Sequence, residues 1–298
     1  MTGLGFVKAH GLGNDFVVID RRETPCPVTP ALARAIADRH RGVGFDQLIT
    51  VDRHPQVAAT VTFWNSDGSE SGACGNGTRC VAGLLMTELE TGAVTLKTER
   101  GLLVCRDAGD GQITVDMLEP RLEWDQIPLA ERMDTRGIDL KLGPIDAPTL
   151  HSPGCVSMGN PHAVFFVDDI AAHDIARAGP FLENHFLFPE RANIGFAQVR
   201  DPGRIRLRVW ERGAGLTLAC GSGACAAVVA GVRKQLLDRT VEVEVDGGTL
   251  TVTWRESDGH VLMTGPWSRV FDAEFDADWL AAVRAETDAE AGGPGQAA

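Results

Sequence analysis

The stretch Ala73-Cys-Gly-Asn-Gly77 returns almost unchanged as Ala219-Cys-Gly-Ser-Gly223 in this chain of 298 residues. Its two cysteines, Cys74 and Cys220, stand 146 positions apart. Three further pairs keep the same spacing: Asn14 with Asn160, Gln47 with Asn193, and Asn65 with Glu211. Because several polar positions repeat at one spacing, the sequence predicts an internal duplication with two equivalent sites that face each other.

The order of secondary structure around each cysteine repeats as well. The patterns predict helices over 75–90 and 221–237, and the second is apolar on nearly every side up to Arg233, as in a buried helix. Short alternating strands follow each helix, at 94–98, 102–106 and 112–117 in the first half and at 241–245, 249–254 and 261–264 in the second. A further helix is indicated by Thr29 as N-cap, Pro30 in the first turn and Gly42 past the end.

These elements predict an α+β fold of two similar, pseudo-symmetric domains. We place the first domain at residues 1–120, carrying Cys74 and joined by 267–285, and the second at 121–266, carrying Cys220. The last stretch, 286–298, is rich in Ala, Gly and Glu, and its composition predicts a disordered tail.

Composition and charge narrow the class of protein. A net charge of -13 opposes binding to nucleic acid and to anionic membranes. The N-terminus does not read as a signal peptide, and no apolar run approaches the length that spans a bilayer. We therefore expect a cytoplasmic protein whose seven cysteines are thiols. Neither cysteine spacing fits a common zinc pattern, so no metal site is predicted.

A glycine-rich turn that opens a helix suits chemistry at a carboxylate. The unpaired backbone N–H groups and the positive end of the helix dipole attract negative charge. Two such turns could stabilise the carboxylate of an amino acid while its α-proton leaves, without pyridoxal phosphate or any other cofactor. The same helix starts should lower the pKa of an adjacent cysteine, which would give one thiolate to take the proton and one thiol to return it.

Other uses of these residues are less favoured. Neither turn has the lysine of a Walker motif or the spacing of a dinucleotide-binding motif, which disfavours nucleotide binding. Free cysteines are often small core residues, and we assign that role to the other five, Cys26, Cys80, Cys105, Cys155 and Cys225. The symmetric setting of Cys74 and Cys220 favours a catalytic pair.

The remaining motifs resemble those of the diaminopimelate epimerase family, in order along the chain from about Phe6 to Pro266. They are Gly11-Leu-Gly-Asn-Asp-Phe16, Asn65-Ser-Asp-Gly-Ser69, Gly159-Asn-Pro-His162, Arg191-Ala-Asn193 and Trp210-Glu-Arg-Gly213, besides the two cysteine motifs. The resemblance implies conversion of LL- to meso-diaminopimelate, for lysine and peptidoglycan precursor synthesis, without cofactor. It also implies two domains that each wrap a central helix in mixed sheet, a site in the cleft between them, and a homodimer.

The resemblance also implies roles for single residues. Gly75, Asn76, Gly221 and Ser222 would bind the reacting carboxylate. The other groups of the substrate would be held by Asn14, Asn65, Asn160, Asn193, Glu211 and Arg212, with Gln47 in the same shell. Arg212 suits the distal carboxylate, and Glu211 suits an ammonium group. His162 and Glu211 would also tune the pKa values of the thiols.

Two alternatives stay open from the sequence. A proline or hydroxyproline racemase shares the two-cysteine chemistry but binds a ring and would not need Arg212 and the set of asparagines. A redox-regulated binding protein, in which Cys74 and Cys220 form a disulfide, would use the same residues without catalysis.

Overall fold

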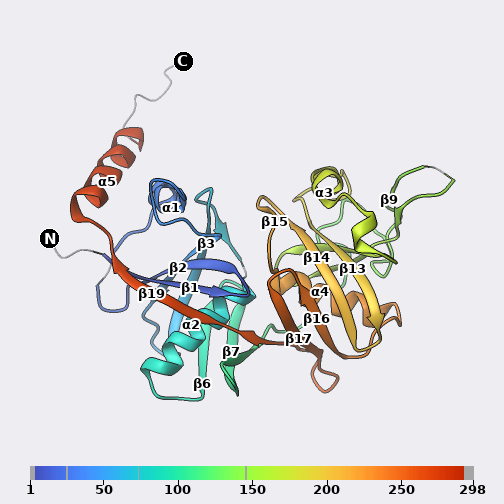
Figure 1. Cartoon of the computed structure of the whole chain (residues 1–298), viewed down its shortest axis with the longest axis horizontal. Helices are drawn as coiled ribbons and strands as arrows, with labels where there is room; N and C mark the ends of the chain where they lie inside the picture. Colours follow the sequence, from blue (N-terminus) through green and yellow to red (C-terminus); the bar gives the residue numbers. More distant parts are fainter. Residues whose placement is uncertain (1–3, 25, 73, 145, 292–298) are drawn as a thin grey trace.

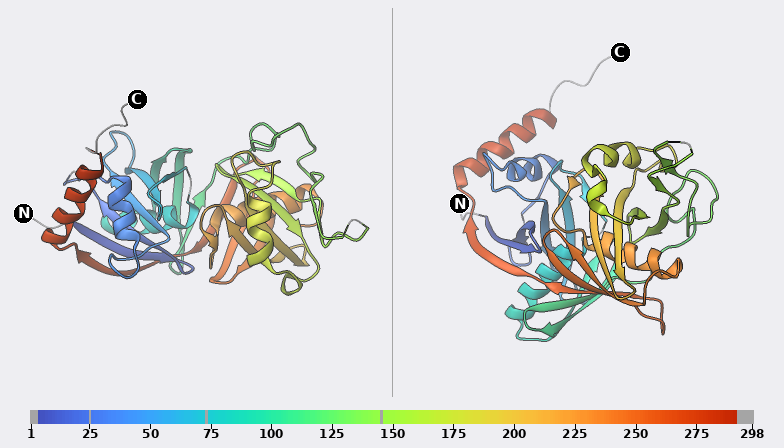
Figure 2. Two further views of the ribbon diagram at one scale, coloured as in Figure 1. Left: turned by 90° about the horizontal axis from the view of Figure 1, so that it is seen from above. Right: turned by 45° about the vertical axis from the view of Figure 1, so that its right-hand side comes forward.

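The computed structural model describes residues 4–291 except 25, 73 and 145. Figure 1 and the left view of Figure 2 show two halves side by side, each built of strands around one long helix. No helix among the described residues is long and apolar enough to cross a membrane.

The first half runs from β1 to β8. Its elements are β1 (Gly5–Gly11), β2 (Asn14–Asp20), α1 (Pro30–Ala37), β3 (Gln47–Asp52), β4 (Ala59–Asn65), β5 (Glu70–Ser71), α2 (Gly75–Glu88), β6 (Ala93–Thr98), β7 (Gly101–Gly109) and β8 (Gln112–Asp116). Helix α1 starts as the sequence predicts, because the Thr29 side chain accepts a hydrogen bond from the Leu32 N–H and Pro30 occupies the first turn.

The second half repeats this plan, with α3 in the place of α1, and adds β9, β10 and the 3-10 helix η1. Its elements are β9 (Lys141–Leu142), β10 (Leu150–His151), β11 (Gly154–Ser157), β12 (Pro161–Phe166), the 3-10 helix η1 (Ile170–Ala172), α3 (Ile175–Glu183), β13 (Asn193–Asp201), β14 (Arg204–Glu211), β15 (Gly215–Leu216), α4 (Gly221–Arg233), β16 (Thr240–Val245), β17 (Gly248–Trp254) and β18 (Val261–Pro266). Helices α2 and α4 begin where the sequence predicts and end two to four residues earlier.

One continuous sheet joins the halves. The first half contributes the order β1-β2-β3-β4-β6-β7-β8, and the second contributes β11-β12-β13-β14-β16-β17-β18. The two meet where β8 pairs antiparallel with β18. Each half contains two parallel pairs, β2 with β3 and β4 with β6, then β12 with β13 and β14 with β16. This mixed, duplicated sheet confirms the predicted fold class.

The duplication extends to the register of the strands. Across β2, β3 and β4, facing residues have counterparts 146 positions later across β12, β13 and β14: Phe16 faces Gln47 as His162 faces Asn193, and Leu48 faces Trp64 as Ile194 faces Trp210. Because side chains alternate between the two faces of a strand, equal register places equivalent side chains on equivalent faces. The paired polar residues therefore occupy matching positions in the two halves.

The chain returns to the first half at its end. Strand β19 (Ser268–Glu274) pairs antiparallel with β1, and helix α5 (Ala277–Ala291) lies beside α1 (Figure 1). The predicted disordered tail is wrong for residues 286–291, because α5 continues to Ala291. The Ala and Glu content that favours disorder also favours a helix. Residues 292–298 lie outside the described residues, and the domain boundaries at 120 and 266 stay a prediction.

The two long helices form the centre of the main core. Helices α2 and α4 are buried along most of their length, among apolar residues of both halves. A glycine allows α2 to pack closely at one point, because a Cβ atom at Gly83 would lie 2.1 Å from the ring of Trp267. Two smaller cores lie beneath the helices α1 and α5 and beneath α3. The sheet therefore holds the starts of α2 and α4 against each other.

Candidate active site

Cys74 and Cys220 are the N-cap residues of α2 and α4. Met263 lies between the two helix starts, because a Cβ atom at Gly75 would be 2.6 Å from its Cε and one at Gly221 would be 3.0 Å from its Sδ. Glycine at both positions therefore lets the two helices approach. The helix starts are also bonded directly, since Asn76 Nδ2 donates to the carbonyl oxygen of Ala219 at 3.1 Å.

A cavity of about 90 Å³ lies where the two helix starts meet. Every residue that the sequence assigns to catalysis or substrate binding lines it: Cys74, Cys220, Asn14, Gln47, Asn65, Gly75, Asn76, Asn160, Asn193, Glu211, Arg212, Gly221 and Ser222. The structure thus brings together residues that lie far apart in the sequence, while their individual roles stay predictions. His162, which the sequence analysis assigns to tuning the thiol pKa values, does not line the cavity and contacts Ser222 of its wall.

Five residues that the sequence analysis did not assign also line the cavity: Asp46, Glu70, Ser71, Ala214 and Thr217. A signal for two of them was present, because Ser71 and Thr217 are hydroxyl residues separated by the same 146 positions as the cysteines. Asp46 could not be found in this way, since its counterpart in the second half is Ala192.

The asparagines and Arg212 are held in place by hydrogen bonds. Asn193 donates from Nδ2 to the carbonyl of Pro161 at 2.8 Å and accepts at Oδ1 from the backbone N–H of Arg212 at 3.0 Å. The Arg212 guanidinium donates from Nη1 to the carbonyl of Glu190 at 2.9 Å. On the opposite wall, Gln47 Nε2 donates to Asn65 Oδ1 at 3.1 Å. These bonds leave a rigid set of donors around the cavity.

His162 is connected to Cys220 through the side chain of Ser222. Its Nε2 lies 3.0 Å from Asn160 Oδ1 and 3.1 Å from Ser222 Oγ, and Ser222 Oγ in turn lies 3.7 Å from Cys220 Sγ. Burial lowers the pKa of His162 to about 3, with the charges of Arg212 and Arg100 acting in the same direction. The ring is therefore neutral at physiological pH and orients two polar residues of the site.

The two thiols differ in their partners. Cys74 Sγ accepts a hydrogen bond from the backbone N–H of Gly77 at 3.3 Å, whereas Cys220 Sγ donates to Glu211 Oε2 at 3.0 Å. The other carboxylate oxygen of Glu211 accepts from the hydroxyl of Thr217. A sulfur that accepts from an N–H is suited to be a thiolate, and a sulfur that donates to a carboxylate is a thiol.

The direction of the thiol pKa shifts corrects the sequence analysis. The helix starts predict lowered values, but burial raises the pKa of Cys74 to about 12, with Gly77 N–H and Arg79 acting against it. Burial, and after it the charge of Glu211, raises the pKa of Cys220 well above its usual value. Removal from water outweighs the helix dipole, because it disfavours the thiolate directly. Both cysteines are therefore protonated in the closed cavity at neutral pH.

Glu211→Gln should make Cys220 more reactive. The carboxylate charge of Glu211 disfavours the Cys220 thiolate, so its removal should lower the pKa of Cys220. At a pH below that pKa, alkylation by iodoacetamide should then rise about tenfold for each unit that the pKa falls. Peptide mass analysis after timed alkylation measures this rate. Thr217→Val, which keeps the carboxylate, is the control, and unchanged or slower alkylation of Cys220 in Glu211→Gln would contradict the assignment.

Comparison with known proteins decides the family. The family model described as diaminopimelate epimerase matches residues 6–123 and 154–270, one segment in each half. A diaminopimelate epimerase of Acidiphilium cryptum is 57% identical over 276 residues, covering 93% of this chain and 98% of its own. Another, of Caulobacter sp. strain K31, is 55% identical over 275 residues, covering 89% and 95%.

The chain belongs to the diaminopimelate epimerase family. Members of this family are isomerases, and the membership confirms the resemblance drawn from the motifs. It also decides against the proline racemase alternative as the main assignment.

Solved structures show how widely the fold is shared. A hydroxyproline epimerase from Agrobacterium vitis aligns with a TM-score of 0.68 at 13% identity, covering 93% of this chain and 94% of its own. A probable proline racemase from Agrobacterium radiobacter K84 aligns with a TM-score of 0.66 at 15% identity, covering 92% and 93%. At these identities the likeness concerns the fold alone.

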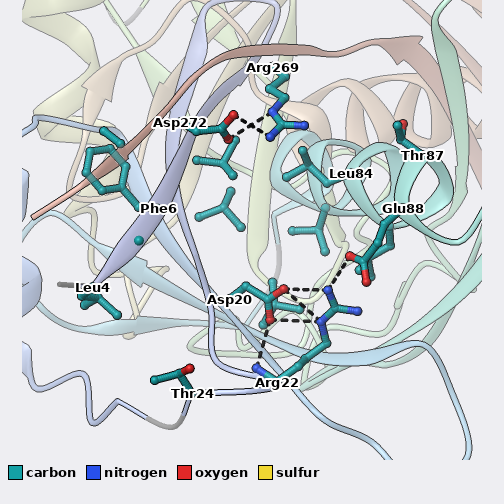
Figure 3. A pocket seen from close by; sticks show the side chains of 17 residues that line it. Leu4, Phe6, Asp20, Arg22, Thr24, Leu84, Thr87, Glu88, Arg269 and Asp272 are labelled. Carbon is teal, nitrogen blue, oxygen red and sulfur yellow. Dashed lines mark hydrogen bonds and ion pairs between the residues drawn. The ribbon is translucent and has the colours of Figure 1, made fainter. Parts of the chain in front are cut away.

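A larger groove of about 750 Å³ lies away from the cysteines, between α2 and the strands β1, β2 and β19. Figure 3 shows that its charged side chains pair among themselves: Arg22 with Asp20 and Glu88, and Arg269 with Asp272. It contains none of the predicted site residues. Within the described part of the chain, no cluster of three or more His, Cys, Asp and Glu could hold a metal ion.

Proposed function

We propose that this member of the diaminopimelate epimerase family interconverts LL- and meso-diaminopimelate, with Cys74 and Cys220 as the two proton carriers. One observation carries the proposal: the two cysteines cap two buried helices that converge on a single polar cavity. The reaction would use only groups of the chain itself and would supply precursors of lysine and of peptidoglycan.

In the proposed step, the thiolate of one cysteine takes the proton from the α-carbon. The electron pair of the broken C–H bond moves into the carboxylate, which becomes an enediolate. The thiol of the other cysteine then gives its proton to the opposite face of the carbon, and its sulfur is left as the thiolate. Charge is conserved and the centre is inverted.

The hydrogen-bond partners favour Cys74 as the first base. A backbone N–H acts on each sulfur, that of Gly77 on Cys74 and that of Gly223 on Cys220, but only Cys220 also donates to a carboxylate, that of Glu211. Because both pKa values are raised by burial, a thiolate forms only at a cost, and the approach of the α-ammonium group would offset part of it. Glu211, whose carboxylate oxygens are both engaged, acts on Cys220 in this proposal more than on the substrate ammonium.

The helix starts would bind the reacting carboxylate through backbone groups. The first N–H groups of a helix have no acceptor within the helix, and at α2 and α4 they belong to Gly75, Asn76, Gly221 and Ser222. The Asn76 side chain is committed elsewhere, since its Nδ2 bonds Asn14 and Ala219. These fixed donors stabilise the enediolate more than the carboxylate, because the negative charge grows there.

The test is α-proton exchange in deuterated water. Purified, reduced protein is offered LL-diaminopimelate or L-proline, and deuterium at the α-carbon and the ratio of stereoisomers are followed by NMR. Exchange with inversion of diaminopimelate, and none with proline, is the expected result. Turnover of proline without diaminopimelate would replace this proposal by the racemase alternative, and turnover of neither would favour a binding protein.

We propose further that the protein is a cytoplasmic homodimer. Strand β19 pairs on one side only with β1, all seven of its residues are exposed, and they include Val270 and Phe271. An exposed edge strand with apolar side chains is a template for pairing with another chain. Light scattering should therefore give a mass near twice 31.9 kDa, and Val270→Lys should shift it toward the monomer. A wild-type monomer at all concentrations would contradict the dimer.

A further inference from the structure

Arg79, in the second turn of α2, is a fully buried arginine to which no role has been given. Its side chain is 0% exposed. The guanidinium donates from Nη2 to Asn76 Oδ1 at 2.9 Å and lies 3.4 Å from the carbonyl of Pro266 and from Met263 Sδ. No carboxylate of a described residue pairs with it. A buried charge without a counter-ion is costly, so its presence in the core calls for a functional explanation.

Arg79 is one end of a chain of hydrogen bonds that crosses the first half of the site. Asn76 accepts from Arg79 and donates from Nδ2 to Asn14 Oδ1 at 3.1 Å. Asn14 then donates from Nδ2 to Asp46 Oδ2 at 2.8 Å. A guanidinium can only donate and a carboxylate can only accept. The charged ends therefore fix both carboxamides in one orientation.

This chain of four residues also ties the two halves together. The Asn76 Nδ2 that donates to Asn14 also lies 3.1 Å from the carbonyl of Ala219, the residue before Cys220. Asn76 itself stands two positions after Cys74. If its carboxamide turned over, an oxygen would face the Ala219 carbonyl and repel it. The orientation of Asn76 therefore controls the contact between the start of α2, after Cys74, and the residue before Cys220.

Among its described residues, the second half has no equivalent series of hydrogen bonds that begins at an arginine and ends at a carboxylate. The counterparts of Arg79 and Asp46, 146 positions later, are Cys225 and Ala192, both buried and uncharged. The fold also makes room for the guanidinium, since a Cβ atom at Gly11 would be 3.0 Å from Arg79 Nη2 and one at Gly265 would be 3.3 Å from its Cζ. The guanidinium of Arg79 in α2 therefore has no equivalent at the matching position of α4.

We propose that Arg79 is a positioning residue for epimerisation. It holds the Asn76 side chain in the orientation that bonds the carbonyl of Ala219, and so keeps the segments that carry Cys74 and Cys220 in contact. It also places a positive charge near Cys74. The inference rests on the proposed function. Asp46 serves as the acceptor at the far end of the same chain. Neither residue exchanges a proton with the substrate in this scheme.

The kinetic test is a double-mutant cycle with Arg79→Met and Asn76→Ala, which keeps the backbone N–H of residue 76. Misplacing a catalytic group by about 1 Å costs about 100-fold in rate, so we expect Arg79→Met to lower kcat about 100-fold with a much smaller change in KM. Because Arg79 acts on the rate mainly through Asn76, the double variant should lose clearly less than the product of the two single losses. Additive losses would overturn the proposal.

A second test needs no substrate and so separates this inference from the proposed function. Burial raises the pKa of Cys74 most, and Glu211 and Cys80 act in the same direction, whereas the Gly77 N–H and the charge of Arg79 lower it. In Arg79→Met, alkylation of Cys74 by iodoacetamide at one fixed pH should slow, because less of it is thiolate, while alkylation of Cys220 keeps its rate. An unchanged rate at Cys74 would overturn the proposal even if diaminopimelate proves not to be the substrate.

Two further variants separate the effect on catalysis from an effect on folding. Arg233→Met makes the same change at the end of α4, where Arg233 is half-buried and donates to the carbonyl of Cys155 and to Thr135 Oγ1, and it should leave both readouts at wild-type values. If circular dichroism shows that Arg79→Met does not fold, Asp46→Ala replaces it in the cycle, because the Asp46 side chain is 32% exposed and its loss is better tolerated. A loss in Asp46→Ala that adds to that of Asn76→Ala would again count against the proposal.

Discussion

Cys74→Ala and Cys220→Ala are each expected to lower the rate of epimerisation by about 10⁴-fold or more, with the fold retained. General acid–base groups contribute up to about 10⁴-fold each, and in this reaction neither proton carrier has a substitute. Cys74 is partly exposed and Cys220 lines the same cavity, although Cys220 also belongs to the main core, so circular dichroism checks the fold of both variants. Inversion of LL-diaminopimelate, followed by NMR or chiral chromatography, is the measurement.

The matched controls are Cys80→Ala and Cys225→Ala. These cysteines lie in α2 and α4 within two turns of the catalytic pair, but their side chains are 0% exposed and outside the cavity. They should lose some stability and keep epimerase activity. Full activity in either Cys74→Ala or Cys220→Ala would contradict the two-base mechanism. A comparable loss of activity in the two control variants, with their folding unchanged, would contradict it as well.

Arg212→Lys is expected to impair turnover of diaminopimelate strongly while barely changing whatever slow exchange lysine shows. Lysine keeps the distal ammonium group and lacks the distal carboxylate, so only the far end of the substrate distinguishes the two. Truncating one partner of a buried charge pair typically costs about 2–5 kcal/mol, or roughly 30- to 4,000-fold. A lysine at this position retains a point charge but cannot reproduce the planar fork of a guanidinium.

The measurement is α-deuterium incorporation into both substrates by wild type and variant. Arg191→Lys is a suitable control, because Arg191 pairs with Glu183 outside the cavity and carries the same chemical change. Comparable losses on diaminopimelate and lysine would show that Arg212 serves the reacting centre. In that case our assignment of the two ends of the substrate would be reversed.

The sequence by itself determined the repeat and most of its consequences. A spacing of 146 positions located both cysteines, the paired asparagines and the starts of α2 and α4, because a duplicated chain folds each copy by the same local rules. The cap at Thr29 and the strands after each helix were predictable for the same reason, since they depend on neighbours in the sequence. The full motif set was enough to identify the family.

Only the tertiary structure decided the electrostatics of the site. The pKa of Cys74 depends on burial by side chains from both halves, which no local pattern around the helix start contains, so the predicted direction was wrong. The chain from Arg79 to Asp46 leaves no signal in the repeat, because neither charged end recurs in the second half. Such contacts join residues distant in sequence: Arg79 and Asn76 lie in α2, Asn14 begins β2 and Asp46 precedes β3. Only the packing of α2 against these strands brings them within hydrogen-bond distance.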